Sequence, residues 1–295
     1  MDIAILADIH GNYIALNECI SHAKERGIRS FIFLGDYLGE LAYPARTMRM
    51  LYDLKEQYEC WFIRGNKEDY WLNHTEEDIK TGFWKEFDST TGSLFYTYSH
   101  LTERDLKFYH ELPISRRLSF SGLPEITICH GSPYKVNEKL LPDDERTLEI
   151  MEQTDTSFIL CGHTHRQRKI THNEKIVLNA GSVGVPLDSN GKAQYMILHG
   201  EQGMWKEEFI SLSYDVEKVI SELHEAELDK YAPWWCFVTE NLLRKGNISH
   251  AQVLTRAMKF CEEEYGECRW PQVPEKCWEQ AAKEMIGEEY ENKNN

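Results

Sequence analysis

The 295-residue sequence contains no apolar run of about 18 residues, the length that crosses a bilayer, so we expect no membrane-spanning segment. Met1 and Asp2 lead directly into a strand-like segment, and we therefore expect no N-terminal targeting signal. The eight cysteines include no Cys-x-x-Cys pair, which favours a reduced, cytoplasmic protein. Cys261, Cys268 and Cys277 are candidates for a zinc site, but their spacing fits no standard one, and buried helix cysteines are the favoured interpretation.

Positive charge is also scarce, because 33 Lys and Arg residues stand against 49 Asp and Glu, for a formal net charge of −16. Proteins that bind nucleic-acid polymers gather Lys and Arg on one face, so this balance argues against such a partner. An acidic protein that acts on a phosphate compound needs a local source of positive charge, and bound metal ions are the natural one. The chain is long enough for one large domain, or for a domain with an appendage.

The first third of the chain alternates strand and helix patterns. Residues 2–7, 30–34 and 59–63 are apolar runs typical of buried strands, and the patterns over 12–26 and 44–57 predict helices between them. This order implies parallel strands joined by right-handed crossovers. Ligands of such sheets gather outside the carboxyl ends of the strands. The polar residues that follow the three predicted strands are Asp8, Asp36 and Asn66.

The remainder divides into three parts. Residues 67–111 are helical and rich in aromatic residues, which predicts a cap-like insertion. Strand patterns with turns then continue to about residue 212 and predict a second sheet. Four helical patterns follow, and Trp234 and Trp235 make this part too apolar for a free linker. We expect it to dock on the core or, as the second possibility, to form a contact between copies of the chain in a homo-oligomer.

Seven polar side chains at strand ends form a candidate metal site. They are two carboxylates, one amide and four imidazoles, contributed by Asp8, His10, Asp36, Asn66, His130, His163 and His165. Oxygen and nitrogen donors without a thiolate suit Mn²⁺, Fe²⁺, Zn²⁺ or Ni²⁺. Seven ligands are more than one ion accepts from a protein, so two ions that share a carboxylate fit the number and leave room for water and substrate. The two histidines around Thr164 share one ion only if the chain turns at Gly162, or else they serve two adjacent ions.

The order of five short motifs resembles that of the calcineurin-like metallophosphoesterase superfamily. These motifs are Asp8-Ile9-His10, Gly35-Asp36, Gly65-Asn66, His130 and Gly162-His163-Thr164-His165. The segment from Asn179 to Gly184 looks like the small bacterial branch of phosphodiesterases and diadenosine polyphosphate hydrolases, with Ala180 where that branch has proline. The resemblance implies an α/β (α+β) fold, a four-layer αββα sandwich over residues 1–212. A helical extension over 213–287 and a disordered tail over 288–295 complete the predicted organisation.

The resemblance also implies the roles of the seven residues. One metal ion would be held by Asp8, His10 and His165, and the other by Asn66, His130 and His163. Asp36 would bridge the two ions, with Asp36 and His130 counted among the catalytic residues and Asn66 among those that contact substrate. A hydroxide between the ions would attack phosphorus in line, which makes the predicted protein a metal-dependent phosphoesterase.

One position departs from the family pattern, because Lys67 stands where the family has histidine, and Glu68 follows it. Two nearby dications would lower the pKa of Lys67 enough for it to donate a proton to the leaving group. The alternatives are a fixed charge on the phosphate oxygens and a solvated lysine at a helix start. Alkyl monoesters need a general acid more than nucleotide or aryl leaving groups do. We therefore predict a phosphodiester or dinucleoside polyphosphate substrate; a broad phosphomonoesterase, a protein phosphatase and a non-catalytic metal-binding scaffold are the alternatives.

Further residues are candidates for substrate contact. Aromatic residues that could stack a nucleobase, although such residues more often pack a cap, are Tyr37, Tyr43, Trp71 and Trp84. Arg166 and Arg168 lie beside the Gly-His-Thr-His segment and could bind a distal phosphate, or simply pair on a surface strand. The predicted partner is a small phosphate compound, with nucleotides among the candidates.

Overall fold

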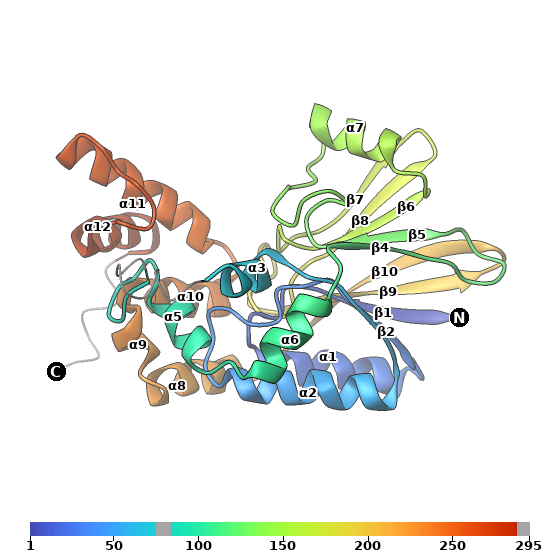
Figure 1. Ribbon diagram of the computed structural model, residues 1–295, viewed down its shortest axis with the longest axis horizontal. Coiled ribbons are helices and arrows are strands. Elements are labelled where there is room, and N and C mark those ends of the chain that lie inside the picture. Colours follow the sequence, from blue (N-terminus) through green and yellow to red (C-terminus); the bar gives the residue numbers. More distant parts are fainter. Residues whose placement is uncertain (75–83, 288–295) are drawn as a thin grey trace.

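The computed structural model describes residues 1–74 and 84–287, and two five-stranded sheets form its centre (Figure 1). The first sheet has the order β10-β9-β1-β2-β3. Its strands are β1 (Asp2–Leu6), β2 (Ser30–Phe33), β3 (Glu59–Phe62), β9 (Ala193–Glu201) and β10 (Met204–Leu212). The pairs β1–β2 and β2–β3 are parallel, which confirms the topology predicted from the first third of the chain.

The second sheet has the order β4-β5-β6-β8-β7 and stacks on the first. Its strands are β4 (Ser115–Leu118), β5 (Ile126–Cys129), β6 (Phe158–Cys161), β7 (Gln167–His172) and β8 (Lys175–Ala180). Ile3 and Ile5 of β1 pack between the sheets against Leu160 and Leu178, whereas Ala4 and Leu6 point to the outer face. This alternation follows from the two-residue period of a strand whose two faces are both buried.

Helices cover both outer faces of the sheet pair. α1 (Tyr13–Glu25) and α2 (Pro44–Gln57) pack on the first sheet, and α7 (Glu145–Gln153) packs on the second through Ile150 and Met151 (Figure 1). The layers are therefore helix, sheet, sheet and helix, so the predicted four-layer sandwich is confirmed.

The predicted insertion consists of α3 (Asn66–Leu72), α5 (Gly92–Ser99) and α6 (Glu103–Glu111), and its residues 75–83 lie outside the described residues. α6 belongs to the main core, because its Tyr109 is fully buried and stacks on Tyr37 with 6.2 Å between ring centroids. The part around α5 extends beyond the sandwich, toward the C-terminal helices.

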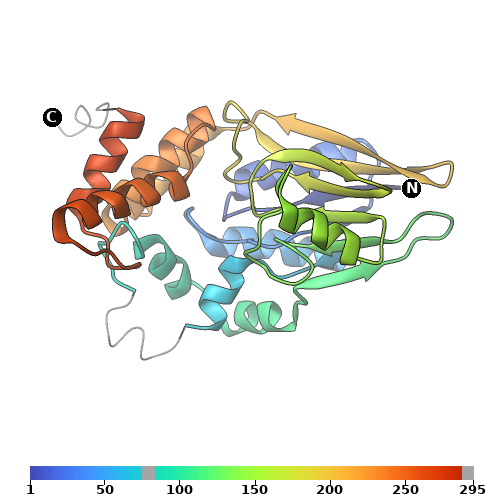
Figure 2. The ribbon, with the colours of Figure 1, turned by 90° about the horizontal axis from the view of Figure 1, so that it is seen from above.

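Up to residue 287, where the described part of the chain ends, five helices follow the last strand: α8 (Val216–Glu225), α9 (Leu228–Tyr231), α10 (Pro233–Lys245), α11 (His250–Tyr265) and α12 (Glu275–Ile286). They gather at the end of the sandwich away from the N-terminus (Figure 2). α10–α12 enclose an apolar core around Trp278, and the Trp278 Nε1–H donates to Thr90 Oγ1 at 2.9 Å. The helices thus dock on the rest of the chain, while the predicted tail 288–295 lies outside the described residues. Every helix within 1–74 and 84–287 is too short or too polar to cross a bilayer.

The contact between Thr90 and Trp278 gives a test of this docking. Thr90→Val should lower the free energy of unfolding by about 1–3 kcal/mol, because it leaves the Trp278 N–H buried without an acceptor. Urea unfolding of the full chain measures the change. Thr171→Val on the exposed side of β7 is the matched control and should have little effect. Equal stability of the two variants would contradict the contact.

Candidate metal centre

Five of the seven predicted ligand residues have left-handed backbone conformations. They lie just after β1, β2 and β6, with φ angles of 55° at Asp8, 52° at His10, 52° at Asp36, 65° at His163 and 56° at His165. Residues other than glycine rarely adopt this conformation, and such strain is concentrated at functional sites. Its consequence is geometric: the chain leaves the extended form at each strand end, so neighbouring ligands need not point to opposite sides.

Glycines beside these residues allow a close approach of the loops. A Cβ on Gly162 would lie 2.5 Å from Asp8 Oδ2, and one on Gly65 would collide with the Asp36 carboxylate. The turn expected at Gly162 is instead made by His163 and His165, while Gly162 provides the space for Asp8. The Gly-His and Gly-Asn pairs are thus required by packing at the strand ends.

Glu68 joins the loops that follow β2 and β3 through hydrogen bonds to their backbone. Its carboxylate is fully buried and accepts the backbone N–H groups of Asp36 at 2.9 Å, Tyr37 at 2.9 Å and Gly65 at 2.8 Å. Burial and the Asp36 carboxylate raise the pKa of Glu68 to about 7. One side chain therefore sets the distance between the ends of β2 and β3.

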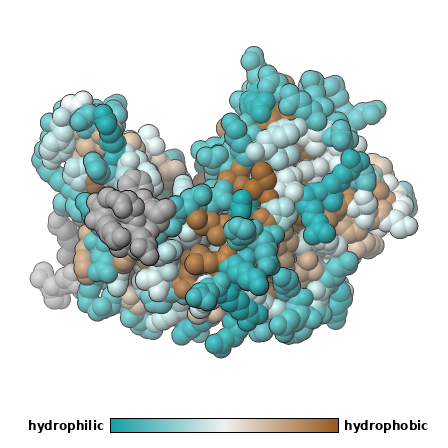
Figure 3. Space-filling view, in the orientation of Figure 1, coloured by the Kyte–Doolittle hydropathy of each residue, from teal (hydrophilic) through white to brown (hydrophobic). Residues whose placement is uncertain are grey.

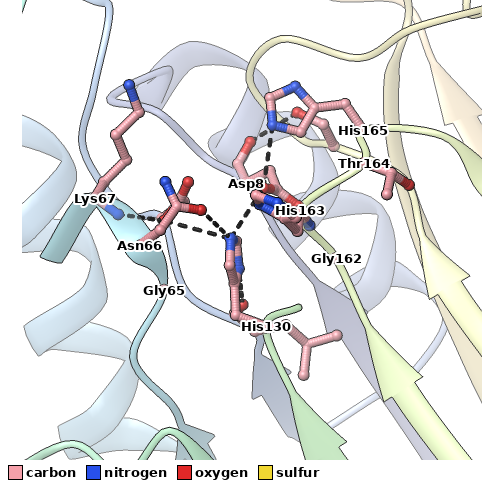
Figure 4. A network of polar contacts seen from close by, with 12 residues as sticks. Asp8, Gly65, Asn66, Lys67, His130, Gly162, His163, Thr164 and His165 are labelled. Carbon is pink, nitrogen blue, oxygen red and sulfur yellow. Dashed lines mark hydrogen bonds and ion pairs between the residues drawn. The ribbon is translucent and has the colours of Figure 1, made fainter. Parts of the chain in front are cut away.

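The structure brings predicted ligands into two adjacent groups. Figure 4 shows Asp8, Asn66, His130, His163 and His165 gathered in one place. Asp8, His10 and His165 form one group, and Asp8, Asp36 and His130 form the other, each with ligand atoms within 4.8 Å of one another. Asp8 belongs to both groups, and Asp36 of the second group also lies near the first, because its Oδ2 is 3.7 Å from His10 Nε2 and its Oδ1 is 3.5 Å from His130 Nε2.

The last two predicted ligands lie beside the second group. The Asn66 Oδ1 atom is 3.1 Å from His130 Nε2, and the His163 ring is 5.2 Å from that of His130, between centroids. All seven side chains therefore converge on one end of the sheet pair.

The hydrogen-bond partners of the imidazoles show what this arrangement can hold. The Nδ1 atoms of His165 and His130 donate to the carbonyls of Val185 at 3.0 Å and Leu34 at 2.6 Å. The Nδ1 of His10 lies 2.5 Å from Glu40 Oε2. With the ring proton on Nδ1, each Nε2 presents a lone pair to the centre.

These lone pairs face other electron-rich atoms. His10 Nε2 and His165 Nε2 are 3.1 Å apart, and His165 Nε2 is 3.1 Å from Asp8 Oδ1. Asp8 Oδ1 is buried and accepts no hydrogen bond from the part of the chain that the structure describes. Acceptors that approach one another this closely require a cation among them, so the residues present fit bound metal ions.

In the metal-free protein, protons take the place of that cation. Burial acts to lower the pKa of His10, but Glu40 and Asp8 outweigh it and raise the pKa to about 10. For His130, Asp36 and Asp8 likewise outweigh burial and raise the pKa to about 9. Burial and the neighbouring His130 lower the pKa of His163 to about 4. Burial favours a higher pKa of Asp8, but His165 and His130 hold it below its usual range.

Glu40 is the residue that sequence reasoning missed. It is buried in the loop after β2, where its Oε2 contacts His10 and its Oε1 lies 2.6 Å from Lys67 Nζ. Burial alone would lower the pKa of Lys67, but Glu40 and Asp36 raise it. The expected fall in the pKa of Lys67 rested on two nearby dications, and Glu40 acts in the opposite direction. The sequence has 49 acidic residues, and the only signal for Glu40 was its position four residues after Asp36 in the same loop.

The predicted aromatic contacts need correction. Trp71 is 1% exposed and packs against Tyr109 in the core, so it offers no face to a substrate ring. Tyr37 is also a core residue, and its hydroxyl donates to the Ile63 carbonyl. Trp84 is nearly buried against the His74 ring. Aromatic content close to a motif therefore did not indicate access to the site.

A cavity of about 770 Å³ opens from the centre. Lys67, Arg166 and Arg168 line it from the sandwich, and Trp235 and His250 line it from α10 and α11. Figure 3 shows the surface hollowed between the sandwich and the C-terminal helices. Arg166 is paired with Asp188 at 2.6 Å, whereas Arg168 forms no ion pair with any residue of 1–74 or 84–287. The helical extension is thus a wall of the site.

Comparison with known proteins supports this architecture. Residues 1–203 match the calcineurin-like phosphoesterase superfamily domain. The chain is 27% identical over 246 residues to an uncharacterized protein of Methanocaldococcus jannaschii, an alignment that covers 78% of this chain and 94% of the relative.

Two solved structures share the fold. A hypothetical protein from Pyrococcus horikoshii superposes with a TM-score of 0.70 at 23% identity, over 84% of this chain and 99% of that one. A metallophosphoesterase from Sphaerobacter thermophilus gives a TM-score of 0.65 at 19% identity, over 83% of this chain and 99% of that one.

The raised pKa values predict that metal uptake releases protons. At about pH 7.5, binding of Mn²⁺ should release about two protons, because His10 and His130 are protonated in the metal-free protein. The affinity should rise up to about pH 10, where His10 also loses its proton. Titration calorimetry in buffers of different ionisation enthalpy counts the protons. The same groups stabilise the metal-free fold below their ordinary pKa of 6.5, and this contribution is lost as the pH rises through about 9 and about 10. Binding enthalpies that do not depend on the buffer would show that His10 and His130 are not protonated in the metal-free protein.

Glu40→Gln tests the residue that orients His10. The substitution should weaken Mn²⁺ binding about 10- to 100-fold, because His10 loses the carboxylate that fixes its tautomer and ring orientation. Calorimetry gives the affinity. Glu222→Gln is the matched control, since this glutamate is also mostly buried but pairs with Arg46 away from the cavity. Unchanged affinity in the Glu40 variant would show that His10 is oriented without it.

Proposed function

Because this chain belongs to the calcineurin-like phosphoesterase superfamily and so is a metal-dependent phosphoester hydrolase, we propose that it uses two divalent ions to hydrolyse a small phosphodiester or phosphoanhydride. The observation that carries the proposal is the convergence of imidazole nitrogens and the buried Asp8 Oδ1, which accepts no hydrogen bond from the described residues, on one centre. Mn²⁺, Fe²⁺, Zn²⁺ and Ni²⁺ suit these donors. We place the activity in the cytoplasm, which the eight free cysteines support.

The proposed ligand assignment places the first group of side chains on one ion and, on the other, His130 of the second group with the neighbouring Asn66 and His163. Asp8, His10 and His165 would hold one ion, and Asn66, His130 and His163 the other. Asp36 would serve both, since each of its oxygens faces an imidazole of a different group. When bound, the ions lower the pKa of water to near neutrality and neutralise charge on the phosphoryl oxygens.

The protein's own residues orient the reaction. Glu40 and the carbonyls of Leu34 and Val185 hold three imidazoles with Nε2 toward the centre, which fixes the ligands before substrate arrives. Asn66 presents its amide at the mouth of the cavity, where it would contact the phosphoryl group. Arg166 lines the same cavity and would contact a more distant anionic group.

Lys67 would act as a fixed positive charge on the phosphoryl oxygens. Its ammonium group is paired with Glu40, and its raised pKa disfavours donation of a proton. Without a general acid in that position, esters whose leaving group departs unprotonated should react best. Aryl diesters and phosphoanhydrides such as dinucleoside polyphosphates meet this requirement, and alkyl monoesters do not.

A panel of substrates tests the proposal. We expect Mn²⁺-loaded protein to hydrolyse aryl diesters or dinucleoside polyphosphates faster than alkyl monoesters and phosphopeptides. Lys67→Ala should lower kcat/KM about a hundredfold for every leaving group, because a fixed charge serves all of them equally. Steady-state kinetics across aryl leaving groups of graded pKa gives the comparison.

Three controls accompany the panel. Asp36→Asn should abolish turnover of every substrate, whereas Lys206→Ala, an exposed lysine on β10, should leave it unchanged. Thermal unfolding checks that each variant is folded. A loss in Lys67→Ala that grows with the pKa of the leaving group would instead identify Lys67 as the proton donor. Inactivity with every transition ion would overturn the proposed function.

A further inference from the structure

A second cavity of about 620 Å³ adjoins the metal centre. One face of α3 forms part of its wall, with Asn66, Tyr70 and Asn73 spaced along one side of the helix. Asn66 also lines the first cavity, so the two cavities meet at a side chain that we assign to the metal centre. A group bound in either cavity therefore lies close to the reacting phosphorus.

Three exposed aromatic side chains from distant parts of the chain line this second cavity, together with the nearly buried Trp84 and with His74. Tyr70 on α3 is 41% exposed, Tyr134 after β5 is 44% exposed, and Trp270 after α11 is 39% exposed. The rings of Tyr70 and Trp270 stack with 6.4 Å between centroids and 26° between planes. Large aromatic side chains that remain exposed together in a concave place mark a binding site.

We infer that Tyr70, Tyr134 and Trp270 form an aromatic subsite, which binds a flat ring on one side of the reacting phosphate. This inference rests on the proposed function, because a diester or anhydride has organic groups on two sides of the reacting phosphate. One organic group would lie in the cavity lined by residues of α10 and α11, and the ring on the other side of the phosphate would lie in the aromatic subsite. Exposed aromatic faces bind such rings by stacking, whatever the ring's pattern of polar atoms.

The polar lining of the subsite includes a charged pair, Lys135 and two amides. Arg64 is already paired with Asp69 at 2.8 Å, so its charge is compensated. Asn73 and Asn137 also line the cavity, and their amides can both donate and accept hydrogen bonds at the edge of a heteroaromatic ring. The volume lies within the range of about 300–1,000 Å³ that holds small molecules, whereas a contact between subunits would be flatter.

The subsite joins the family domain to the C-terminal helices. Tyr70 and Tyr134 lie within the matched residues 1–203, whereas Trp270 lies beyond them. The helical extension thus contributes to both cavities, through Trp235 and His250 in one and Trp270 in the other. Part of the surface that would contact the substrate therefore lies outside the residues that match the family.

Two phosphonates test the subsite without turnover, because their carbon–phosphorus bond is not hydrolysed. Phenylphosphonate and cyclohexylphosphonate carry the same groups on phosphorus except that only the phenyl ring is flat. Titration calorimetry with the Mn²⁺-loaded full chain should show phenylphosphonate binding about five- to tenfold more tightly, as stacking of one ring provides. Trp270→Ala and Tyr134→Ala should each reduce this preference, and Trp270→Phe should retain it.

Tyr265→Ala is the matched control, since this tyrosine is 54% exposed at the end of α11 but does not line the cavity; it should keep the preference. Equal affinities for the two phosphonates in the unmodified protein would overturn the subsite. A change in sedimentation from dimer to monomer in Trp270→Ala, without a change in the affinity ratio, would also overturn it and identify a subunit contact. If the preference is found but no diester is hydrolysed, the subsite stands and the proposed function fails.

Discussion

The structure depends on an electrostatic requirement at the carboxyl ends of the strands. Two imidazole nitrogens 3.1 Å apart, with a buried carboxylate oxygen beside them, repel one another unless positive charge lies among them. Without metal, protons supply that charge, which is why the pKa values of His10 and His130 are so high. The core of the sandwich provides the rigidity that holds such groups together, because their mutual repulsion would otherwise separate them.

Strained backbone conformations are part of the energetic cost of holding these polar groups together. Asp8, Asp36 and His163 adopt left-handed conformations that a free chain would avoid, and glycines stand wherever two loops approach within contact distance. Glu68 compensates by accepting three backbone N–H groups from two loops. Binding of cations would relieve the repulsion among these polar groups. The protein thus organises the centre before any ion or substrate arrives.

The C-terminal helices line the approach to this centre. They dock through buried contacts such as that of Trp278 with Thr90, and they supply walls to two cavities that meet at Asn66. A chemically similar centre can therefore serve different substrates when the attached helices differ, since the reaction takes place on the phosphate and recognition takes place on its substituents.

The sequence by itself determined the sandwich, the parallel strands and the set of seven polar residues at their ends, because alternation of apolar residues and chain order are local properties. The convergence of those residues could be expected, since carboxyl ends of parallel strands share an edge. The tertiary structure alone decided that Glu40 lies against His10 and Lys67, that Trp71 is buried, and that Trp270 reaches Tyr70. Such contacts join residues from separate elements, and they depend on how helices dock and side chains pack, for which no short stretch of sequence has a signature.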